Sequence, residues 1–147
     1  LLSHSVNLAL GTDGGASNND LDMFSEMRTA ALVAKGIAGD ARSLPAHQIL
    51  EIATINGAKA LGIEQKIGSL EVGKYADITA VNLNSFNTLP NHNPLSHLVY
   101  AAKSSQVSHV WCGGRAILQN GALKTIDEGL LRTVTQTWQE RILAMGR

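Results

Sequence analysis

An apolar run that ends in a carboxylate constrains this chain more than any other feature. Residues 6–12 read VNLALGT, and Asp13 follows them directly. Val6, Leu8 and Leu10 share one parity, and the small residues between them share the other parity with Asp13. Because side chains alternate between the two faces of a strand, aliphatic bulk lies on one face and the acid lies on the other. A barrel strand covered by outer helices needs this arrangement, with the acid at the mouth of the barrel.

Asp13 has two interpretations when only its position is considered. In the first it is a turn residue, because Asp-Gly is a common turn dipeptide. In the second it belongs to an active site, because barrel enzymes keep their chemistry at the carboxyl ends of buried parallel strands. There it could ligate a divalent metal, act as a general base, or do both. The segment alone leaves both interpretations open.

Three polar residues follow Asp13 closely. Ser17, Asn18 and Asn19 are candidates for contact with a substrate near that carboxylate. The alternative is that they cap the next helix, a role that such side chains fill locally. The glycines around Asp13 match neither GxGxxG nor a Walker A loop, and no lysine follows them. A phosphate-binding loop is therefore not predicted.

Helical spacing dominates the first 66 residues. Apolar residues from Met23 to Ala34 follow the period of a helix that should end at a glycine, either 36 or 39. A second helix is predicted from Pro45, a residue suited to a first turn. Asn56-Gly57 is expected to interrupt this helix, and a short helix should follow over residues 58–61.

Strand signals dominate the next segment. Strands are predicted over residues 77–83 and on both sides of Gly113-Gly114, with Asn120-Gly121 as a hairpin-type turn. A short helix is expected over residues 94–102. From about Asp127 an apolar stripe at helical spacing runs to the end of the chain.

Charge and composition exclude several classes of protein. Lys plus Arg number 12 and Asp plus Glu number 12, so no basic surface for nucleic acid or an anionic membrane is expected. Aromatic residues are 4% of the chain, too few for a base-stacking platform. No apolar run approaches the ~20 residues of a membrane span. The single cysteine permits no internal disulfide and suits a cytoplasmic protein. The chain starts at Leu1 without an initiator Met, which we interpret as the inside of a longer polypeptide.

The histidines do not form a metal-binding motif by themselves. None of the five pairs as HxH or within HExxH. We expect surface roles for His92 and His97, with a metal pair as the alternative. His109 lies in a strand pattern and is expected to be structural. Cys112 has no second cysteine, so we expect a small buried residue and not a nucleophile.

Three stretches of the sequence carry a resemblance to a known family. Residues 10–35, LGTDGGASNNDLDMFSEMRTAALVAK, closely resemble the last barrel strand and following helix of the amidohydrolase superfamily. The likeness is greatest to its methylthioadenosine/S-adenosylhomocysteine deaminase branch, which includes chlorohydrolase-like (TRZ/ATZ) proteins. Residues 53–63, ATINGAKALGI, and 67–83, IGSLEVGKYADITAVNL, resemble the passage of that superfamily from the barrel into a small β-domain. The resemblance covers essentially the whole chain.

This resemblance implies a fold and a domain organisation. The fold class is α/β, the C-terminal fragment of a (β/α)8 metal-dependent hydrolase barrel plus part of the attached small β-sandwich domain. Residues 1–66 would supply the last strand and terminal helices of the barrel. Residues 67–125 would form part of the β-sandwich with a short helix, and residues 126–147 a C-terminal helix.

The resemblance also implies a chemistry. Members of the superfamily bind one divalent metal, commonly zinc, through histidines of earlier strands and an aspartate after the eighth strand. By motif that aspartate is Asp13, which would bind the metal and take a proton from the metal-bound water. Hydroxide would then attack an aromatic ring carbon, and ammonia would leave. The HxH motif and the later histidines of the family are absent from these residues, so the fragment alone is expected to be inactive.

Three hypotheses for function remain. The first is the C-terminal segment of a metal-dependent aminohydrolase, which hydrolyses carbon–nitrogen bonds in cyclic amidines and deaminates an adenosine-type or related heterocyclic substrate such as methylthioadenosine or S-adenosylhomocysteine. The second is a triazine-type chlorohydrolase, in which the same attack releases chloride. The third is a non-catalytic remnant that acts as an interaction module. The expected partners are a small heterocyclic substrate and either a second copy of the chain or the missing barrel portion.

Overall fold

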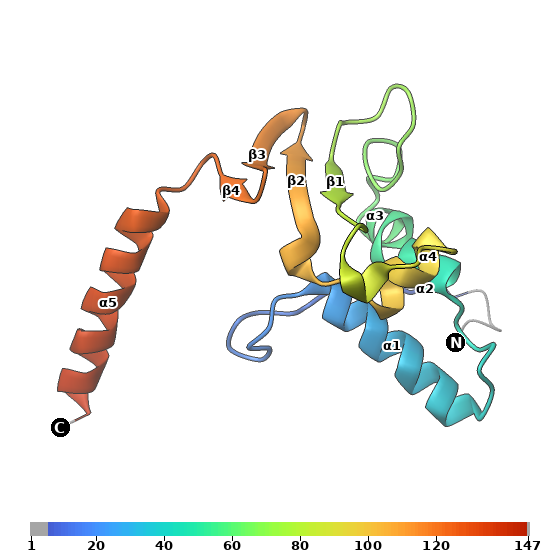
Figure 1. The fold of residues 1–147 in the computed structure, drawn as a ribbon, viewed down its shortest axis with the longest axis horizontal. Helices are drawn as coiled ribbons and strands as arrows, with labels where there is room; N and C mark the ends of the chain where they lie inside the picture. The colour runs from blue at the N-terminus through green and yellow to red at the C-terminus, as the bar shows by residue number, and fades with distance from the viewer. Residues whose placement is uncertain (1–5, 147) are drawn as a thin grey trace.

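The computed structural model describes residues 6–146, which form helices and one antiparallel sheet (Figure 1). The helices are α1 (Met23–Ala38), α2 (Ala46–Ala53), α3 (Ile55–Ala60), α4 (Pro94–Tyr100) and α5 (Glu128–Met145), with 3₁₀ turns at Phe86–Thr88 and Ser104–Gln106. The strands are β1 (Ile78–Val81), β2 (Val107–Cys112), β3 (Arg115–Gln119) and β4 (Ala122–Leu123).

The core lies where α1, α2 and α4 meet. Five buried side chains form it, and they come from all three helices: Met27, Ala31, Ile49, Ile52 and Val99. Ile49 and Val99 have no exposed surface at all. Burial of such aliphatic side chains stabilises a fold by ~1.5–3 kcal/mol each, so this small cluster holds the helices together.

Helix α1 shows how the sequence sets its ends. It ends as predicted at a glycine, Gly39, which takes the left-handed conformation with φ 62°. Its N-cap is Asp22, whose carboxylate accepts the Phe24 N–H at 2.8 Å. The expectation that Asn18 or Asn19 caps this helix is therefore wrong, because Asp22 lies nearer to the first turn and satisfies its amide.

The strand predicted over residues 6–12 is not formed among the described residues. The segment is extended, but it has no neighbouring strand, and Leu10 N–H donates to the Ile52 carbonyl of α2 at 3.3 Å. The predicted alternation of faces is present from Leu8 onward, whereas Val6, predicted on the same face as Leu8 and Leu10, is exposed. Leu8 and Leu10 pack against the helical core, whereas Ala9 and Asp13 are exposed.

The sheet has the strand order β1-β2-β3-β4, with all neighbours antiparallel. The β2–β3 connection runs through Gly113 and Gly114, which have φ 56° and 81°, as a tight hairpin turn requires. Asn120 and Gly121, with φ 51° and 76°, make the second turn. Both turns confirm the prediction from the sequence. Strand β1 is shorter than the strand predicted over residues 77–83.

Two local predictions are corrected by the structure, and a third agrees with it. Asn56-Gly57 does not interrupt the helix but lies inside α3. The break between α2 and α3 comes earlier, at Thr54, which has φ −128° and ψ −93°. Cys112 is exposed and not buried, because it is the last residue of β2 before the hairpin turn. His109 is structural, as expected, and stacks on Trp111 with ring centroids 5.3 Å apart.

The glycine-rich segment before β1 is held by its own polar side chains. Lys74 Nζ donates to Ser69 Oγ at 2.6 Å and lies 3.2 Å from Glu71 Oε1. The Ser69 hydroxyl and the Lys74 ammonium lower the pKa of Glu71. Asp77 Oδ1 accepts the Gly113 N–H at 2.6 Å and so ties this segment to the hairpin. These polar residues between 69 and 77 therefore have a structural role.

Helix α5 lies apart from the other elements, beyond β4 (Figure 1). A helix lies where the apolar stripe predicts one, and every described residue of it is exposed. Its large exposed apolar residues are Leu130, Leu131, Val134, Trp138, Ile142, Leu143 and Met145. Within the described part of the chain, no helix has the length and apolar character needed to cross a membrane.

Candidate functional site

Asp13 lies at the end of the extended segment, where the chain enters the loop before α1. In Figure 1 this loop projects from the helices. Its backbone has φ 59°, a left-handed conformation that residues other than glycine adopt uncommonly. The Gly14 N–H donates to Asp13 Oδ1 at 2.7 Å. The carboxylate is thus presented at the surface in a defined backbone conformation.

A compact turn follows Asp13. The Gly14 carbonyl oxygen accepts three hydrogen bonds, from the Ser17 N–H at 3.1 Å, the Asn18 N–H at 2.9 Å and the Ser17 hydroxyl at 3.0 Å. Ser17 thus closes the turn that begins beside Asp13. Asn19 is exposed and continues the loop.

The pKa of the Asp13 carboxyl is lowered from its ordinary value of 3.8, first by the neighbouring Ser17 hydroxyl and then by the Gly14 N–H. The hydroxyl has one proton, which in the structure goes to the Gly14 carbonyl oxygen. A hydroxyl rotates to suit its acceptors, so it can donate to the carboxylate in place of the carbonyl. Both donors favour the charged form, and Asp13 is ionised at neutral pH.

Asn18 is half-buried, unlike the other two candidate residues. Its side-chain Nδ2 donates to Glu26 Oε1 of α1 at 2.6 Å, and its Oδ1 accepts the Asp20 N–H at 3.1 Å. Both ends of this amide are therefore used within the chain. The structure brings Ser17 and Asn18 into one turn with Asp13, and contact of either with a substrate stays a prediction. Nothing in the sequence pattern singled out Glu26.

The described residues contain no group of three or more His, Cys, Asp or Glu side chains that could hold a metal ion. His4 lies outside them. A protein metal site of the catalytic type needs three or four protein ligands. Asp13 fits the part of one such ligand, because its carboxylate is exposed and only Oδ1 accepts the Gly14 N–H. The other ligands would have to come from elsewhere.

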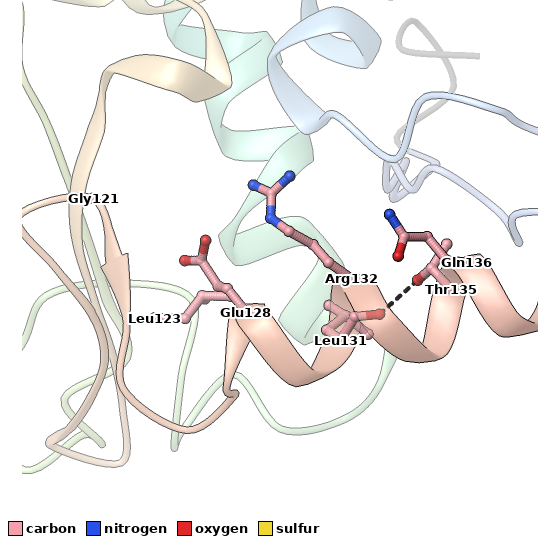
Figure 2. A pocket seen from close by; sticks show the side chains of 7 residues that line it. All are labelled: Gly121, Leu123, Glu128, Leu131, Arg132, Thr135 and Gln136. Carbon is pink, nitrogen blue, oxygen red and sulfur yellow. Dashed lines mark hydrogen bonds between the residues drawn. The ribbon is translucent and has the colours of Figure 1, made fainter.

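Two clefts lie elsewhere on the described part of the molecule. One, of about 600 Å³, lies between α5 and the β3–β4 hairpin, and Figure 2 shows its lining. Glu128, Arg132 and Gln136 project from one side of α5 toward it, and the Thr135 hydroxyl donates to the Leu131 carbonyl at 2.8 Å. The other cleft, of about 340 Å³, lies beside Lys35 and Tyr100. Neither includes Asp13 or the turn after it.

Residues 1–117 match the amidohydrolase family. The match covers most of the chain, including Asp13 and the sheet down to β3. The chain belongs to the amidohydrolase family, and the predicted fold class is confirmed.

Curated relatives narrow the comparison within this family. The chain is 46% identical over 142 residues to the 5-methylthioadenosine/S-adenosylhomocysteine deaminase of Teredinibacter turnerae, a match that covers 97% of this chain and 32% of the relative. It is 50% identical over 127 residues to the protein of the same name from Moorella thermoacetica, covering 86% of this chain and 30% of the relative. The chain thus spans about a third of the length of the curated relatives it matches.

Solved structures that resemble the chain include a deaminase and a chlorohydrolase. An adenosine deaminase from Xanthomonas campestris, determined with bound zinc, is 50% identical and has a TM-score of 0.93, covering 98% of this chain and 33% of that one. The atrazine chlorohydrolase TrzN from Arthrobacter aurescens TC1, complexed with zinc, is 27% identical and has a TM-score of 0.76, covering 94% and 30%. Both the deaminase and the chlorohydrolase likenesses predicted from the sequence are therefore found, and the deaminase likeness is the greater.

Proposed function

We propose that this chain is part of a metal-dependent aminohydrolase that deaminates an adenosine-type heterocycle, and that Asp13 is its contribution to the catalytic centre. The observation that carries the proposal is the exposed Asp13 carboxylate, held in a left-handed turn at the end of the extended segment. A turn acid would explain the residue type. It would not explain why the chain matches a zinc-bound deaminase over 98% of its length.

Asp13 would hold the metal through its carboxylate, with zinc as the proposed ion because related structures contain it. When bound, such an ion lowers the pKa of a water molecule to ~7 and so supplies a nucleophile at neutral pH. The lowered pKa of Asp13 keeps its carboxylate ionised at neutral pH, the form that can hold a metal ion. The Gly14 N–H orients that carboxylate from within the turn.

The second candidate is a triazine-type chlorohydrolase. The TrzN structure supports it, because that neighbour is named for atrazine and matches nearly the whole chain. The identity is 27% there, against 50% for the Xanthomonas deaminase, so deamination is the function we favour. The substrates methylthioadenosine and S-adenosylhomocysteine come to this proposal from the names of the curated relatives.

Several predictions from the sequence belong to this proposal and stay predictions. They are the cytoplasmic location, the inactivity of the 147 residues alone, the contribution of residues 1–66 to a barrel, the β-sandwich role of 67–125, and the separate helix of 126–147. Association with a second copy or with a barrel portion is a further one. The exposed apolar residues of α5 support it, because a helix with that stripe gains stability when another surface covers it.

The test uses a fusion protein in which this chain replaces the matching third of the Xanthomonas campestris deaminase. Asp13→Asn keeps the side-chain size but removes the proton acceptor. We expect ammonia release from adenosine to fall by ~10²–10⁴-fold, with an unchanged circular dichroism spectrum. Ser17→Ala is the matched control and should be far milder. An Asp13→Asn rate above about a tenth of that of the unsubstituted fusion would make Asp13 a turn residue only, since even the weakest loss of a base is larger.

A further inference from the structure

We propose that Glu26 is a positioning residue, which through Asn18 holds the turn that presents Asp13. This inference rests on the proposed function of Asp13, because it concerns how that carboxylate is kept in place. Glu26 lies in the first turn of α1, next to the buried Met27. Its backbone is thus attached to the packed core, whereas Asp13 lies in an exposed loop.

A continuous path of hydrogen bonds joins the two carboxylates. Asp13 Oδ1 accepts the Gly14 N–H at 2.7 Å, and the Gly14 carbonyl accepts the Asn18 N–H at 2.9 Å. The Asn18 side chain then donates to Glu26 Oε1 at 2.6 Å. The path runs from an exposed group to a helix of the core in three hydrogen bonds.

The Asn18–Glu26 bond is the strong member of this path. A hydrogen bond that ends on an ionised carboxylate is shorter and about twice as strong as one between neutral groups. It is also partly shielded from water. A second contact from residues 18–20 to α1, between Ser25 Oγ and Asp20 Oδ2, is longer at 3.4 Å and exposed. Of these two side-chain contacts, the Asn18–Glu26 bond is therefore the stronger.

The backbone of Asp13 needs such an attachment. A residue other than glycine in a left-handed conformation costs ~1–3 kcal/mol and persists only where its surroundings determine it. Residues 14–17 are all exposed and supply no packing. When Asn18 is released from Glu26, the turn gains other conformations, and the carboxylate is correctly placed for a smaller fraction of the time.

Glu26 has a plainer alternative role. An acid in the first turn of a helix stabilises that helix through the helix dipole, whatever its side chain contacts. Two variants separate the roles. Glu26→Gln loses the charge but keeps a carbonyl oxygen that accepts from Asn18, whereas Glu26→Ala loses both.

The first measurement is amide hydrogen exchange in the 147-residue chain, which needs neither metal nor turnover. We expect Glu26→Ala to speed exchange at Asn18, whose amide closes the turn, by about 10- to 150-fold, which corresponds to the ~1.5–3 kcal/mol of a charged hydrogen bond. Exchange at the buried Ala31 should stay within about twofold. Glu26→Gln should restore part of the protection at Asn18, because its neutral carbonyl still accepts the hydrogen bond, though a weaker one. Equal effects of both variants, felt along α1 and not in the turn, would establish the dipole role and overturn the proposal.

The second measurement is steady-state kinetics in the fusion described above. Glu26→Ala should lower kcat by about tenfold or more with little change in KM, because a displaced catalytic group costs rate. Ser25→Ala is the matched control on the same helical turn and should leave kcat unchanged. A full kcat in Glu26→Ala beside an inactive Asp13→Asn overturns the positioning role alone. An active Asp13→Asn overturns the proposed function, and the exchange measurement still decides whether Glu26 holds the turn.

Discussion

Gly68 and Gly73 allow the cost of a steric contact to be measured separately from the cost of a backbone conformation. Both have positive φ, 91° and 96°, and both lie in the segment 67–77 before β1. A Cβ on Gly73 would meet no atom within 4 Å. A Cβ on Gly68 would lie 2.8 Å from Ala58 Cβ and 3.0 Å from Ile55 Cα. Substitution by alanine therefore strains both backbones but crowds only one.

The expected magnitudes follow from these distances. The backbone strain of an L-residue at positive φ is ~1–2 kcal/mol and applies to both variants. Crowding at Gly68 adds ~1–3 kcal/mol, the usual cost of overpacking. The contacted atoms of Ile55 and Ala58 belong to the backbone or lie next to it, so they cannot rotate away, and α3 must move.

Amide exchange of α3 measures the difference. The amides of Ala58 and Leu61 report on this helix, since they donate to Thr54 and Gly57. We expect them to exchange about 5- to 150-fold faster in Gly68→Ala than in Gly73→Ala, which corresponds to the ~1–3 kcal/mol of crowding. Exchange within twofold of each other in the two variants would refute the reasoning, because the contact with α3 would then have no energetic effect.

Three further outcomes are expected. Ile49→Ala should lower the free energy of unfolding of the helical core by ~2–5 kcal/mol. Ile37→Ala, at a side chain 84% exposed, should change that free energy by less than ~0.5 kcal/mol. Urea unfolding, monitored by the exchange of the α2 amides, compares the two variants. Ser17→Ala should raise the pKa of Asp13 toward 3.8 in an NMR titration, because the largest cause of its lowering is lost. Since the pKa of Asp13 is lowered in the folded chain, the ionised carboxylate contributes stability above pH 3.8, and this contribution is lost as the pH falls through the pKa of the folded chain. An unchanged pKa in Ser17→Ala would show that the hydroxyl does not act on the carboxylate. The Cys112 thiol should react with Ellman's reagent without denaturant, and a requirement for denaturant would contradict its exposure.

Features that depend on a few adjacent residues could be predicted from the sequence. The left-handed end of α1 at Gly39 and the hairpin at Gly113-Gly114 each need a glycine at one place, so the residue type indicated the conformation. The packing of Leu8 and Leu10 on one face followed from their spacing alone. These are local consequences of backbone sterics and of side-chain periodicity.

Features that depend on distant partners could not be predicted in this way. Strand pairing needs a neighbour, and no other described strand lies beside residues 6–12. Asn18 looked like a helix cap because caps are local, but its amide goes to Glu26, eight residues away. The candidate site divides similarly: the motif indicated Asp13, whereas its link to α1 depends on how the loop folds back. Spacing along the chain carries no signal for such a contact.

Because side chains alternate between two faces in residues 8–13, substitutions within this short segment fall into two kinds. Substitutions at Leu8 and Leu10 are felt by the packed helices. Substitutions at Ala9 and Gly11 are felt on the side of Asp13, where a Cβ added at Gly11 would meet no atom of the described chain within 4 Å. The positions that contact the packed helices and the positions on the side of Asp13 are thus different ones. A side chain beside Asp13 can therefore be exchanged without altering the contacts of Leu8 and Leu10 with the core.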